Sequence, residues 1–380
     1  MSPALRVDVL PAAALGEGER ALWAEFVRAA PHLQSPFLSF EYAQAAGRVV
    51  PGAHVAVAHR GGEIAAFLPF QRRGSTLQPL GAPLTDYHGL VSRPGDAVNL
   101  ETVVRGLNGA EYRFGALCTD RPPVGAEPGN ACVADLSDGY AAYVAAQQAR
   151  YGRWFKDMRR KGRGMEADFG PMTFSWERDP ALLEWVLARK REQYRASRLH
   201  DVFACGWTER LLRTLWELPE GGCHGRLAVL RAGEHVVAAT FNLHGPSEHY
   251  MWFPAYDAAA HRWSPGVFLY LKVIEAAAAE GCGVVDFGPS VTNGKRFLTA
   301  PGRPVYSGTV FGSRWREAAS TAAERLLAPA PLVGELRARA RRRFDVITAC
   351  ETDAVAWLGG AALAARRMLS SGRAAEMTAN

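Results

Sequence analysis

A short stretch near residue 265 has the composition of a phosphate-binding turn. An aromatic, extended segment and a polar loop end at Ser264, and Pro265 and Gly266 then open an apolar run with helical spacing. A helix that begins just after a strand presents free backbone N–H groups and a positive dipole end. We therefore expect this turn to bind a phosphate-bearing cofactor, with an ordinary capped strand–helix–strand unit as the alternative.

A second chemically dense stretch lies in the first half of the chain, in a loop rich in glycine and proline. It places a carboxylate, a phenol and an imidazole side by side, as Asp86, Tyr87 and His88. These groups can exchange hydrogen bonds with a sugar or another polar ligand. The alternative is a turn in which Asp86 caps backbone N–H groups and His88 only satisfies its own hydrogen bonds.

Basic residues cluster at 156–163, where the side chains include Lys156, Arg159 and Arg160. Apolar residues interrupt the run, so one helix face can pack while the other presents cations. Arginine and lysine in such an array suit an anionic substrate such as a diphosphate. A solvated helix face is the alternative for a run of this kind.

The secondary-structure elements around these groups must position them. Helices are expected at 17–29, 37–46, 98–107, 140–150, 180–197, 205–218 and from 265 to the glycine at 281. Strands are expected at 7–10, 54–58, 64–70, 112–117, 131–135, 173–176, 250–256, 284–287 and 304–310. Two segments, VAVAHRGGEIAAFLPF and GRLAVLRAGEHVVAATFNLH, both read as hairpins with a Gly-Glu turn. A repeat at this long spacing indicates two copies of one fold.

Composition excludes several classes of protein. The 380 residues are 48% hydrophobic and 22% charged, which is typical of globular rather than disordered chains. The net charge of +6 suits anionic small molecules, and the basic residues form no known nucleic-acid-binding motif. The six cysteines lack metal-ligand spacing, so we expect reduced thiols and no metal. With no signal-peptide pattern and no apolar run approaching about 20 residues, a cytoplasmic protein is expected.

From residue 314 onward the composition shifts to alanine, arginine and leucine. Helices are expected at 318–327, 333–344 and 353–369, and the second carries five arginines: Arg337, Arg339, Arg341, Arg342 and Arg343. This tail is too short to bury a core of its own. It can pack on the body, form a dimer, touch anionic lipid, or bind a nucleotide second messenger.

Five motifs, taken in order, carry a resemblance to a known family. They are PLGAPLTDYHGLV at 79–91, KDMRRKGR at 156–163, KREQYRASRLHDVFACGWT at 190–208, SPG at 264–266 and DFGPSVTNGKRF at 286–297. Together they resemble GNAT acyltransferases of the CelD/BcsL type. This FemAB-like group with a duplicated core includes N-acetyltransferases of exopolysaccharide and holdfast synthesis. The resemblance covers most of residues 50–310.

This resemblance implies an α/β (α+β) fold. It would consist of tandem GNAT-like domains, each a mixed, mostly antiparallel sheet flanked by helices. A substrate-shaping domain would occupy residues 1–138, and a catalytic domain that binds acyl-CoA would occupy 139–313. A helical tail would follow at 314–380.

The chemistry that the resemblance implies is direct transfer of an acyl group from acetyl-CoA, as co-substrate, to an amine. Asp286, at a strand end, is then the first candidate for the base and His249 the second. The alternative for Asp286 is a buried aspartate that caps the following loop. Lys295 would stabilise transition-state charge or bind a phosphate, unless it is an ordinary exposed lysine. The co-substrate would lie on the turn formed by Arg262, Ser264, Pro265, Gly266 and Val267.

The sequence departs from the family pattern at this turn. The usual R/Q-x-x-G-x-G/A loop is absent, and RWSPG at 262–266 stands in its place. Because proline lacks an N–H group, Gly266 and Val267 remain as the backbone donors, and Arg262 can supply positive charge. The departure leaves the donor open between acetyl-CoA and aminoacyl-tRNA, which FemAB-like relatives can use.

The acceptor implied by the resemblance is an amino sugar in an exopolysaccharide or cell-envelope polysaccharide precursor, as a small molecule or linked to a lipid. It would lie between the two halves, in a polar and basic site lined by Asp86, Tyr87, His88, Lys156, Arg159 and Arg160. One alternative is a FemAB-type aminoacyl transferase acting on a cell-wall precursor. Another is a regulated effector that binds cyclic di-GMP through its tail. We expect no nucleic-acid partner and at most peripheral contact with the inner membrane.

Overall fold

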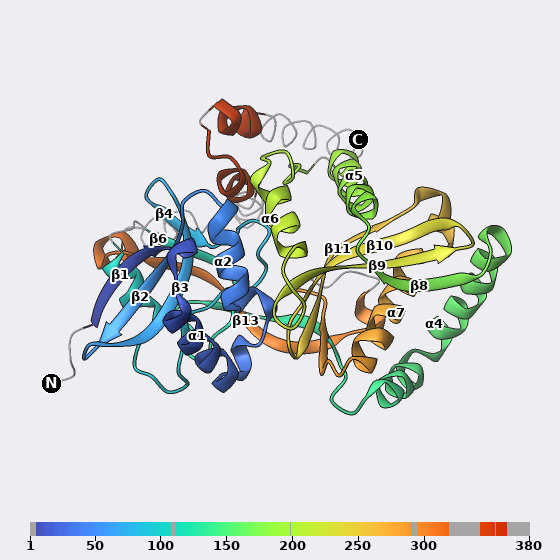
Figure 1. The fold of residues 1–380 in the computed structure, drawn as a ribbon, viewed down its shortest axis with the longest axis horizontal. Coiled ribbons are helices and arrows are strands. Elements are labelled where there is room, and N and C mark those ends of the chain that lie inside the picture. The colour runs from blue at the N-terminus through green and yellow to red at the C-terminus, as the bar shows by residue number, and fades with distance from the viewer. Residues whose placement is uncertain are drawn as a thin grey trace, which may run out of the picture.

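One long sheet runs through the protein from end to end. The computed structural model describes residues 5–107, 111–197, 199–289, 295–318, 343–353 and 355–362. Within them, the strand order is β1-β2-β3-β4-β6-β13-β7-β12-β11-β10-β9-β8, and β5 pairs with β3. Figure 1 shows the first half of the chain at the left, the second half at the right, and β13 crossing between them. The predicted mixed α/β fold class is confirmed.

The first half contributes seven strands and three α-helices to the described structure. Its strands are β1 (Leu5–Pro11), β2 (Ala53–Arg60), β3 (Glu63–Arg73), β4 (Thr76–Pro79), β5 (Val91–Ser92), β6 (Glu111–Leu117) and β7 (Glu127–Asp135). Its helices are α1 (Glu17–Ala29), α2 (Phe40–Val49) and α3 (Leu100–Gly106). The helix predicted at 17–29 is observed with those bounds, because apolar residues such as Trp23 and Phe26 recur on its buried face.

The second half repeats this order of strands and helices after one additional long helix. Its strands are β8 (Met172–Glu177), β9 (His224–Ala232), β10 (His235–His244), β11 (Glu248–Tyr256), β12 (Val284–Asp286) and β13 (Ala300–Phe311). Its helices are α4 (Tyr140–Phe169), α5 (Pro180–Ala196), α6 (Trp207–Trp216) and α7 (Pro265–Ala279), with 3-10 turns η4 (Ala258–Trp263) and η5 (Lys295–Phe297). The helix expected at 140–150 continues through the basic run as one 30-residue helix with a kink at Tyr151.

The predicted repeat is confirmed by the sheet itself. The hairpins β2–β3 and β9–β10 occupy matching places in the two halves, each with a register shift near its turn. In both halves the next strand pairs in parallel with the strand that follows the crossover helix, as β4 with β6 and β11 with β12. The two copies therefore share one topology, and they lie in mirror order along the sheet.

Each half gives its last strand to the other half. Strand β7 ends the first half but pairs with β12, and β13 ends the second half but pairs with β6. The two exchanged strands also pair with each other, which joins the halves into one sheet. The proposed boundary between residues 138 and 139 therefore falls between elements, yet hydrogen-bonded strands cross it in both directions.

The two halves differ most in the strand that follows the hairpin. In the second half this strand is continuous: β11 pairs with β10 over its length, with one bulge at Trp252. In the first half β4 pairs with one part of β3, and β5 pairs with a later part of the same strand. The chain between them, residues 80–90, leaves the sheet where the second half has only a bulge. This excursion carries the predicted Asp86, Tyr87 and His88.

The described part of the tail packs on the body, which was one of the four expected roles. Residues 343–350 are helical, and Ile347 is buried. Arg73 of the first half donates to the Ala349 carbonyl at 3.1 Å, and the Trp207 indole of the second half donates to Cys350 at 2.9 Å. Most of the predicted tail helices lie outside the described residues, as do the predicted nucleotide-binding arginines apart from Arg343. None of the described helices combines the length and apolarity needed to span a bilayer.

Candidate active site

The excursion at 80–90 reaches the second half and forms hydrogen bonds with it. The Tyr87 hydroxyl donates to Asp286 Oδ1 at 2.8 Å. The Tyr250 hydroxyl, on β11, donates to Asp86 Oδ2. The indole of Trp252, at the bulge, donates to the Leu84 carbonyl at 3.0 Å. Residues from both halves therefore meet here, and the predicted Asp86 and Tyr87 are among them.

Asp286 is the most fully engaged carboxylate of this site. It is 1% exposed, and besides Tyr87 it accepts hydrogen bonds from the Gly288 amide at 2.7 Å and from Arg303 Nε at 3.3 Å. Burial raises the pKa of Asp286, while the Arg303 charge opposes that rise. The bond to Gly288 is the cap of the following loop that the sequence offered as the alternative role.

Arg303 joins the exchanged strand β13 to this site, and sequence reasoning missed it. It forms buried ion pairs with Glu248 and Asp286 and lies 5.3 Å from the centre of the Tyr87 ring. A register shift places Gly302 in a bulge directly before it, and a bulge of this kind changes the direction of the side chains beside it. The sequence feature that could have indicated this role is the position of Arg303, a single arginine near the start of an apolar strand.

Asp86 is enclosed but keeps part of its surface exposed. Burial raises the pKa of Asp86 to about 6, against the hydrogen bond from Tyr250 and the charge of Lys295. Lys295 donates to the Phe287 carbonyl at 2.6 Å. Burial lowers the pKa of Lys295, and the Asp86 carboxylate partly restores it. The structure thus brings together three predicted residues, Asp86, Asp286 and Lys295.

Helix α5 adds two residues that the sequence did not single out. Burial lowers the pKa of Lys190 to about 8, and the nearby charge of Lys295 adds to that effect. Burial also raises the pKa of Tyr194, with a smaller contribution from the Asp86 carboxylate. Both side chains are partly exposed. They mark the α5 side of the site as a place where a substrate would meet a cation and a phenol.

His88 holds the excursion rather than facing the site. Its Nε2 atom accepts hydrogen bonds from the amides of Gly115 and Ala116, at 3.2 and 3.4 Å, and its own backbone pairs with β6. Burial lowers the pKa of His88 to about 3, so the ring is neutral. This is the alternative that the sequence left open, in which the imidazole satisfies local hydrogen bonds.

The structure does not bring His249 together with these residues. It follows Glu248 in β11, so its side chain lies on the face of the sheet opposite to that of Tyr250. It is fully buried, with Nδ1 3.4 Å from that of His244 and its ring 5.2 Å from Trp176. Burial lowers the pKa of His249 well below its usual value.

At the start of α7 the Gly266 N–H has no hydrogen-bond partner among the described residues, whereas the predicted donor Val267 is engaged, because its N–H donates to the Ser264 carbonyl at 3.0 Å. Ser264, the residue before the helix, has φ 60° and ψ 50°, and no other non-glycine residue in the described ranges has a positive φ. In this conformation its hydroxyl does not cap the helix but accepts a hydrogen bond from Lys161 at 3.1 Å. A Cβ on Gly266 would meet no atom within 4 Å. Such local strain is typical of binding sites, and an anion would find space, an N–H donor and a lysine here.

Arg262 lies at the rim of this turn, where it has a partner of its own. It forms an ion pair with Asp168 of α4, and its guanidinium lies 4.7 Å from the ring centre of Trp263. The Trp263 indole donates to the same carboxylate at 2.7 Å. The turn is therefore fixed to α4, whose Lys161 belongs to the basic run but was not among the predicted site residues.

The sheet opens beside α7. Strands β11 and β12 pair over three residues only, ending at Tyr250 and Asp286. Strand β11 continues to Tyr256, on the way to η4 and α7. The last pair, at Tyr250, lies just before the bulge at Trp252. The polar cluster of Asp86, Tyr250 and Asp286 lies at this point, and the start of α7 lies beyond the far end of β11.

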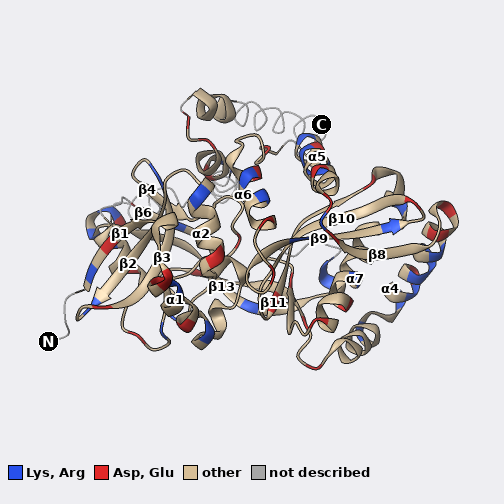
Figure 2. Ribbon diagram, in the orientation of Figure 1, with Lys and Arg blue, Asp and Glu red and all other residues tan. Residues whose placement is uncertain are grey.

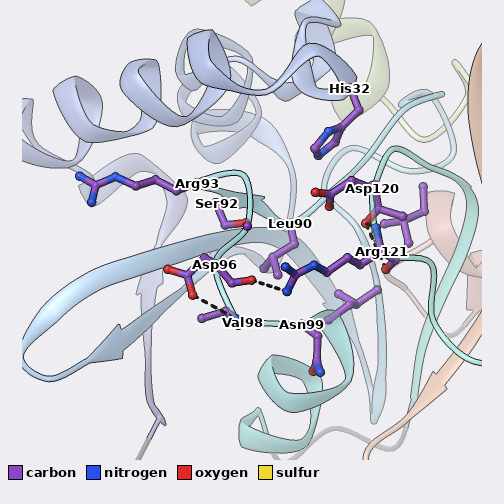
Figure 3. A pocket seen from close by; sticks show the side chains of 13 residues that line it. His32, Leu90, Ser92, Arg93, Asp96, Val98, Asn99, Asp120 and Arg121 are labelled. Carbon is purple, nitrogen blue, oxygen red and sulfur yellow. Dashed lines mark hydrogen bonds between the residues drawn. The ribbon is translucent and has the colours of Figure 1, made fainter. Parts of the chain in front are cut away.

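The N-terminus of the corresponding helix in the first half, α3, is capped by a side chain. Asn99 caps α3 by accepting hydrogen bonds from the amide and hydroxyl of Thr102, at 2.9 and 2.6 Å. Asp96 lies ahead of it and accepts from the Val98 amide, and Arg121 donates to the Asp96 carbonyl (Figure 3). The cavity among these side chains measures about 20 Å³, room for about one water molecule.

The remaining predicted residues, Lys156, Arg159 and Arg160, are exposed on α4. Figure 2 shows the basic residues of this helix along the outer edge of the second half. Arg160 pairs with Asp157 at 2.7 Å. Among the described residues, no hydrogen bond or ion pair joins these three cations to the excursion at 80–90. The described residues also contain no group of histidine, cysteine and acidic side chains that could hold a metal ion.

Comparison with known proteins agrees with this geometry. Residues 152–296 match the family model described as an acetyltransferase (GNAT) domain. No curated protein matches the chain. A solved protein of unknown function from Bacteroides thetaiotaomicron VPI-5482 is 11% identical, with a TM-score of 0.50, over 80% of this chain and 99% of its own.

Two further solved structures are similar at lower TM-scores. A tandem GNAT protein from the clavulanic acid biosynthesis pathway is 12% identical over 82% of this chain and 99% of its own, with a TM-score of 0.47. FemX is 11% identical over 79% of this chain and 96% of its own, with a TM-score of 0.48. It is the family-model match that supports an acyltransferase, and the matched residues lie in the second half of this chain.

Proposed function

We propose that the protein is an acyl-CoA-dependent N-acyltransferase. The observation that carries this proposal is the turn at Ser264–Gly266, where a strained residue leaves the Gly266 N–H free at the start of α7. This turn follows a strand, β11, that separates from its parallel partner β12 after three residue pairs. The family-model match to residues 152–296 covers both features. When bound, acyl-CoA supplies an acyl group activated as a thioester.

The residues present fit this co-substrate. Gly266 and Lys161 would hold the diphosphate at the start of α7, since one offers an open backbone N–H and the other a cation. The free edge of β11 between Tyr250 and Tyr256 would line the path of the pantetheine arm. Lys295, beside Phe287 at the end of β12, would stabilise negative charge that develops on the carbonyl oxygen.

Asp286 is proposed to organise the reacting groups. Its bonds to Tyr87, Gly288 and Arg303 fix the excursion of the first half against the end of β12. The acceptor would then bind between the excursion and α5. An amino sugar suits this position, because Asp86, Lys190 and Tyr194 offer hydrogen-bond partners of different charge at one place.

Calorimetry with acetyl-CoA tests the first part of the proposal. We expect binding to the full-length chain, and no binding would contradict it. Release of CoA thiol in the presence of an amino-sugar panel, including glucosamine and UDP-glucosamine, tests the second part. A chain that binds aminoacyl-tRNA in place of acetyl-CoA would indicate the FemAB-type aminoacyl transferase instead.

The finer assignment, to an exopolysaccharide or cell-envelope precursor at the inner membrane, remains part of the proposal. Deletion of the gene should remove N-acetyl groups from such a polymer, which mass spectrometry of its sugars would detect. Cyclic di-GMP binding by the tail is a separate question. Calorimetry with the full-length chain and with a chain ending near residue 314 would answer it.

A further inference from the structure

We propose that Asp86, contributed by the first half, is the group that accepts a proton from the acceptor ammonium. The inference rests on the proposed N-acyltransferase function and assigns a reacting residue to it. Asp86 was first expected to bind substrate, and Asp286 to act as base. The geometry points to a division of these roles between the two carboxylates.

Asp286 has no oxygen available for an incoming ammonium. Its Oδ1 atom accepts from Tyr87 and Gly288, its Oδ2 atom accepts from Arg303, and the residue is 1% exposed. In Asp86, by contrast, Oδ2 accepts from Tyr250. In the described part of the chain its Oδ1 receives no hydrogen bond, and the side chain is partly exposed. A general base must come within hydrogen-bond distance of the proton that it removes, and Asp86 can do so.

Asp86 also lies where the sheet opens. Its partner Tyr250 belongs to the last residue pair that joins β11 to β12. The loop after β12 passes so close that a Cβ on Gly288 would lie 2.7 Å from the Tyr250 hydroxyl and 3.9 Å from Asp86 Oδ2. An acyl group held between the diverging strands would therefore face this carboxylate.

The electrostatics of the site favour this role. Burial raises the pKa of Asp86 to about 6, so the group is ionised at neutral pH yet basic enough to take a proton. Lys190 and Lys295 lie near the same place, and their charges lower the pKa of any ammonium that binds beside them. The phenol of Tyr250 stays protonated, because burial and the Asp86 carboxylate raise its pKa well above the usual value.

The proposed step is balanced. Asp86 takes one proton from the acceptor ammonium, and the neutral amine attacks the thioester carbonyl carbon. The new C–N bond forms and the C–S bond breaks, and the second proton of the nitrogen passes to the thiolate to give CoA thiol. Asp86 then returns its proton to solvent. The net products are an amide, CoA thiol and one proton.

Substitution of Asp86 by asparagine tests the assignment with acetyl-CoA and glucosamine as probes. We expect kcat/KM of D86N to fall by about 10²- to 10⁴-fold, with the acetyl-CoA Kd and thermal unfolding unchanged. Asp120→Asn is the matched control, because Asp120 is an exposed aspartate of the same half. Its activity should equal that of the wild type.

A pH profile separates a base from a merely structural residue. The kcat/KM of the wild type should rise with pH through a limb near pH 6, because burial raises the pKa of Asp86 to about 6. Tyr250→Phe removes a hydrogen bond that favours the carboxylate, so this limb should move to higher pH. D86N should lose the limb and leave a low, flat profile.

The possible outcomes are distinguishable. Activity that survives in D86N, or a limb that stays in place in Y250F, would overturn the role of Asp86 while the proposed function stands. A wild-type chain that binds acetyl-CoA but releases no CoA thiol with any amine of the panel would overturn the proposed function. The role of Asp86 would fall with it.

Discussion

The strand that follows the hairpin has a different role in each half of this protein. In the second half β11 runs unbroken beside β10 and interrupts its register only at Trp252. In the first half the corresponding strand is split into β4 and β5, and residues 80–90 leave the sheet between them. The second copy thus keeps an open strand edge, while the first copy supplies side chains to it. Duplication has allowed one fold to hold the proposed co-substrate and complete the proposed active site.

The helices that follow these strands, α3 in the first half and α7 in the second, also differ at their N-termini. Helix α3 has seven residues, a side-chain cap and an acidic residue, Glu101, at its second position. Helix α7 has 15 residues, no side-chain cap and Gly266 at its second position. A carboxylate near a helix start uses the positive dipole end that an anion would otherwise occupy. Only the second helix is therefore suited to a diphosphate.

Giving α7 the acidic residue of α3 should produce the largest effect. In Gly266→Glu, the new carboxylate should repel the co-substrate and weaken acetyl-CoA binding by about 10- to 100-fold. Calorimetry would measure this. Folding should be unaffected, because Gly266 faces open space and acidic residues stabilise helix starts.

Two variants control for this change. Gly266→Ala leaves the site uncharged and should bind acetyl-CoA nearly as the wild type does. Glu101→Gln, at the matching position of α3, should leave the Kd unchanged. Equal losses in G266E and G266A would show that shape rather than charge governs the turn.

Acid should destabilise both halves, because each contains a buried neutral histidine. The folded pKa of His88 lies near 3 and that of His249 well below 6.5, so below pH 6.5 the unfolded chain binds protons that the folded chain does not. Stability is therefore fully present above pH 6.5. By linkage, His88 should remove about 2 kcal/mol from the free energy of unfolding at pH 5, and His249 should lower it in the same direction.

Urea unfolding at pH 7 and pH 5 would measure these losses. His88→Gln and His249→Gln should each reduce the pH dependence of the free energy of unfolding, because each removes one ring that binds a proton only in the unfolded chain. An unchanged pH dependence in either variant would show that the ring concerned gains its proton in the folded protein.

The junction between the halves can be tested at the exchanged strands. A Cβ on Gly302 of β13 would lie 2.0 Å from Val133 of β7. Gly302→Ala should therefore lower the free energy of unfolding by about 1–3 kcal/mol through overpacking. Gly129→Ala is the matched control, since a Cβ there lies 3.7 Å from Val305. Equal stability of the two variants in urea would contradict the tight junction.

The smallest expected effect separates the two groups of cations on α4. Lys161→Met removes the lysine that contacts Ser264 and should weaken acetyl-CoA binding by about fivefold. Lys156→Met, on the exposed face, should leave that Kd unchanged. If K156M instead raises KM for the amine acceptor, the original assignment of the basic run to the acceptor is supported.

The sequence was most informative about local structure and repetition. Apolar spacing placed helices and strands, and the two similar hairpins indicated the duplication that the sheet order displays. The group of Asp86, Tyr87 and His88 was also recognisable, because three polar side chains in one loop are visible without a fold. Those inferences need only residues close together in the chain.

Long-range pairing was not predictable in this way. Tyr87 and Asp286 are 199 residues apart, and nothing near either residue indicates the other. Arg303 reaches its site through an exchanged strand, and strand exchange leaves no pattern of apolar spacing. Lys161 and Lys156 belong to one basic run, and only the packing of α4 against η4 distinguishes them.

The exchanged strands also determine how the chain can be divided. A polypeptide that begins at residue 139 would lack β7 and leave one side of β12 without a partner, and a polypeptide that ends at 138 would lack β13 beside β6. An unpaired edge of this kind invites association with other chains. Each piece carries the strand that the other needs, so the two should complement each other when produced together and aggregate when produced alone. Co-inheritance of both halves in one gene follows naturally from such mutual dependence.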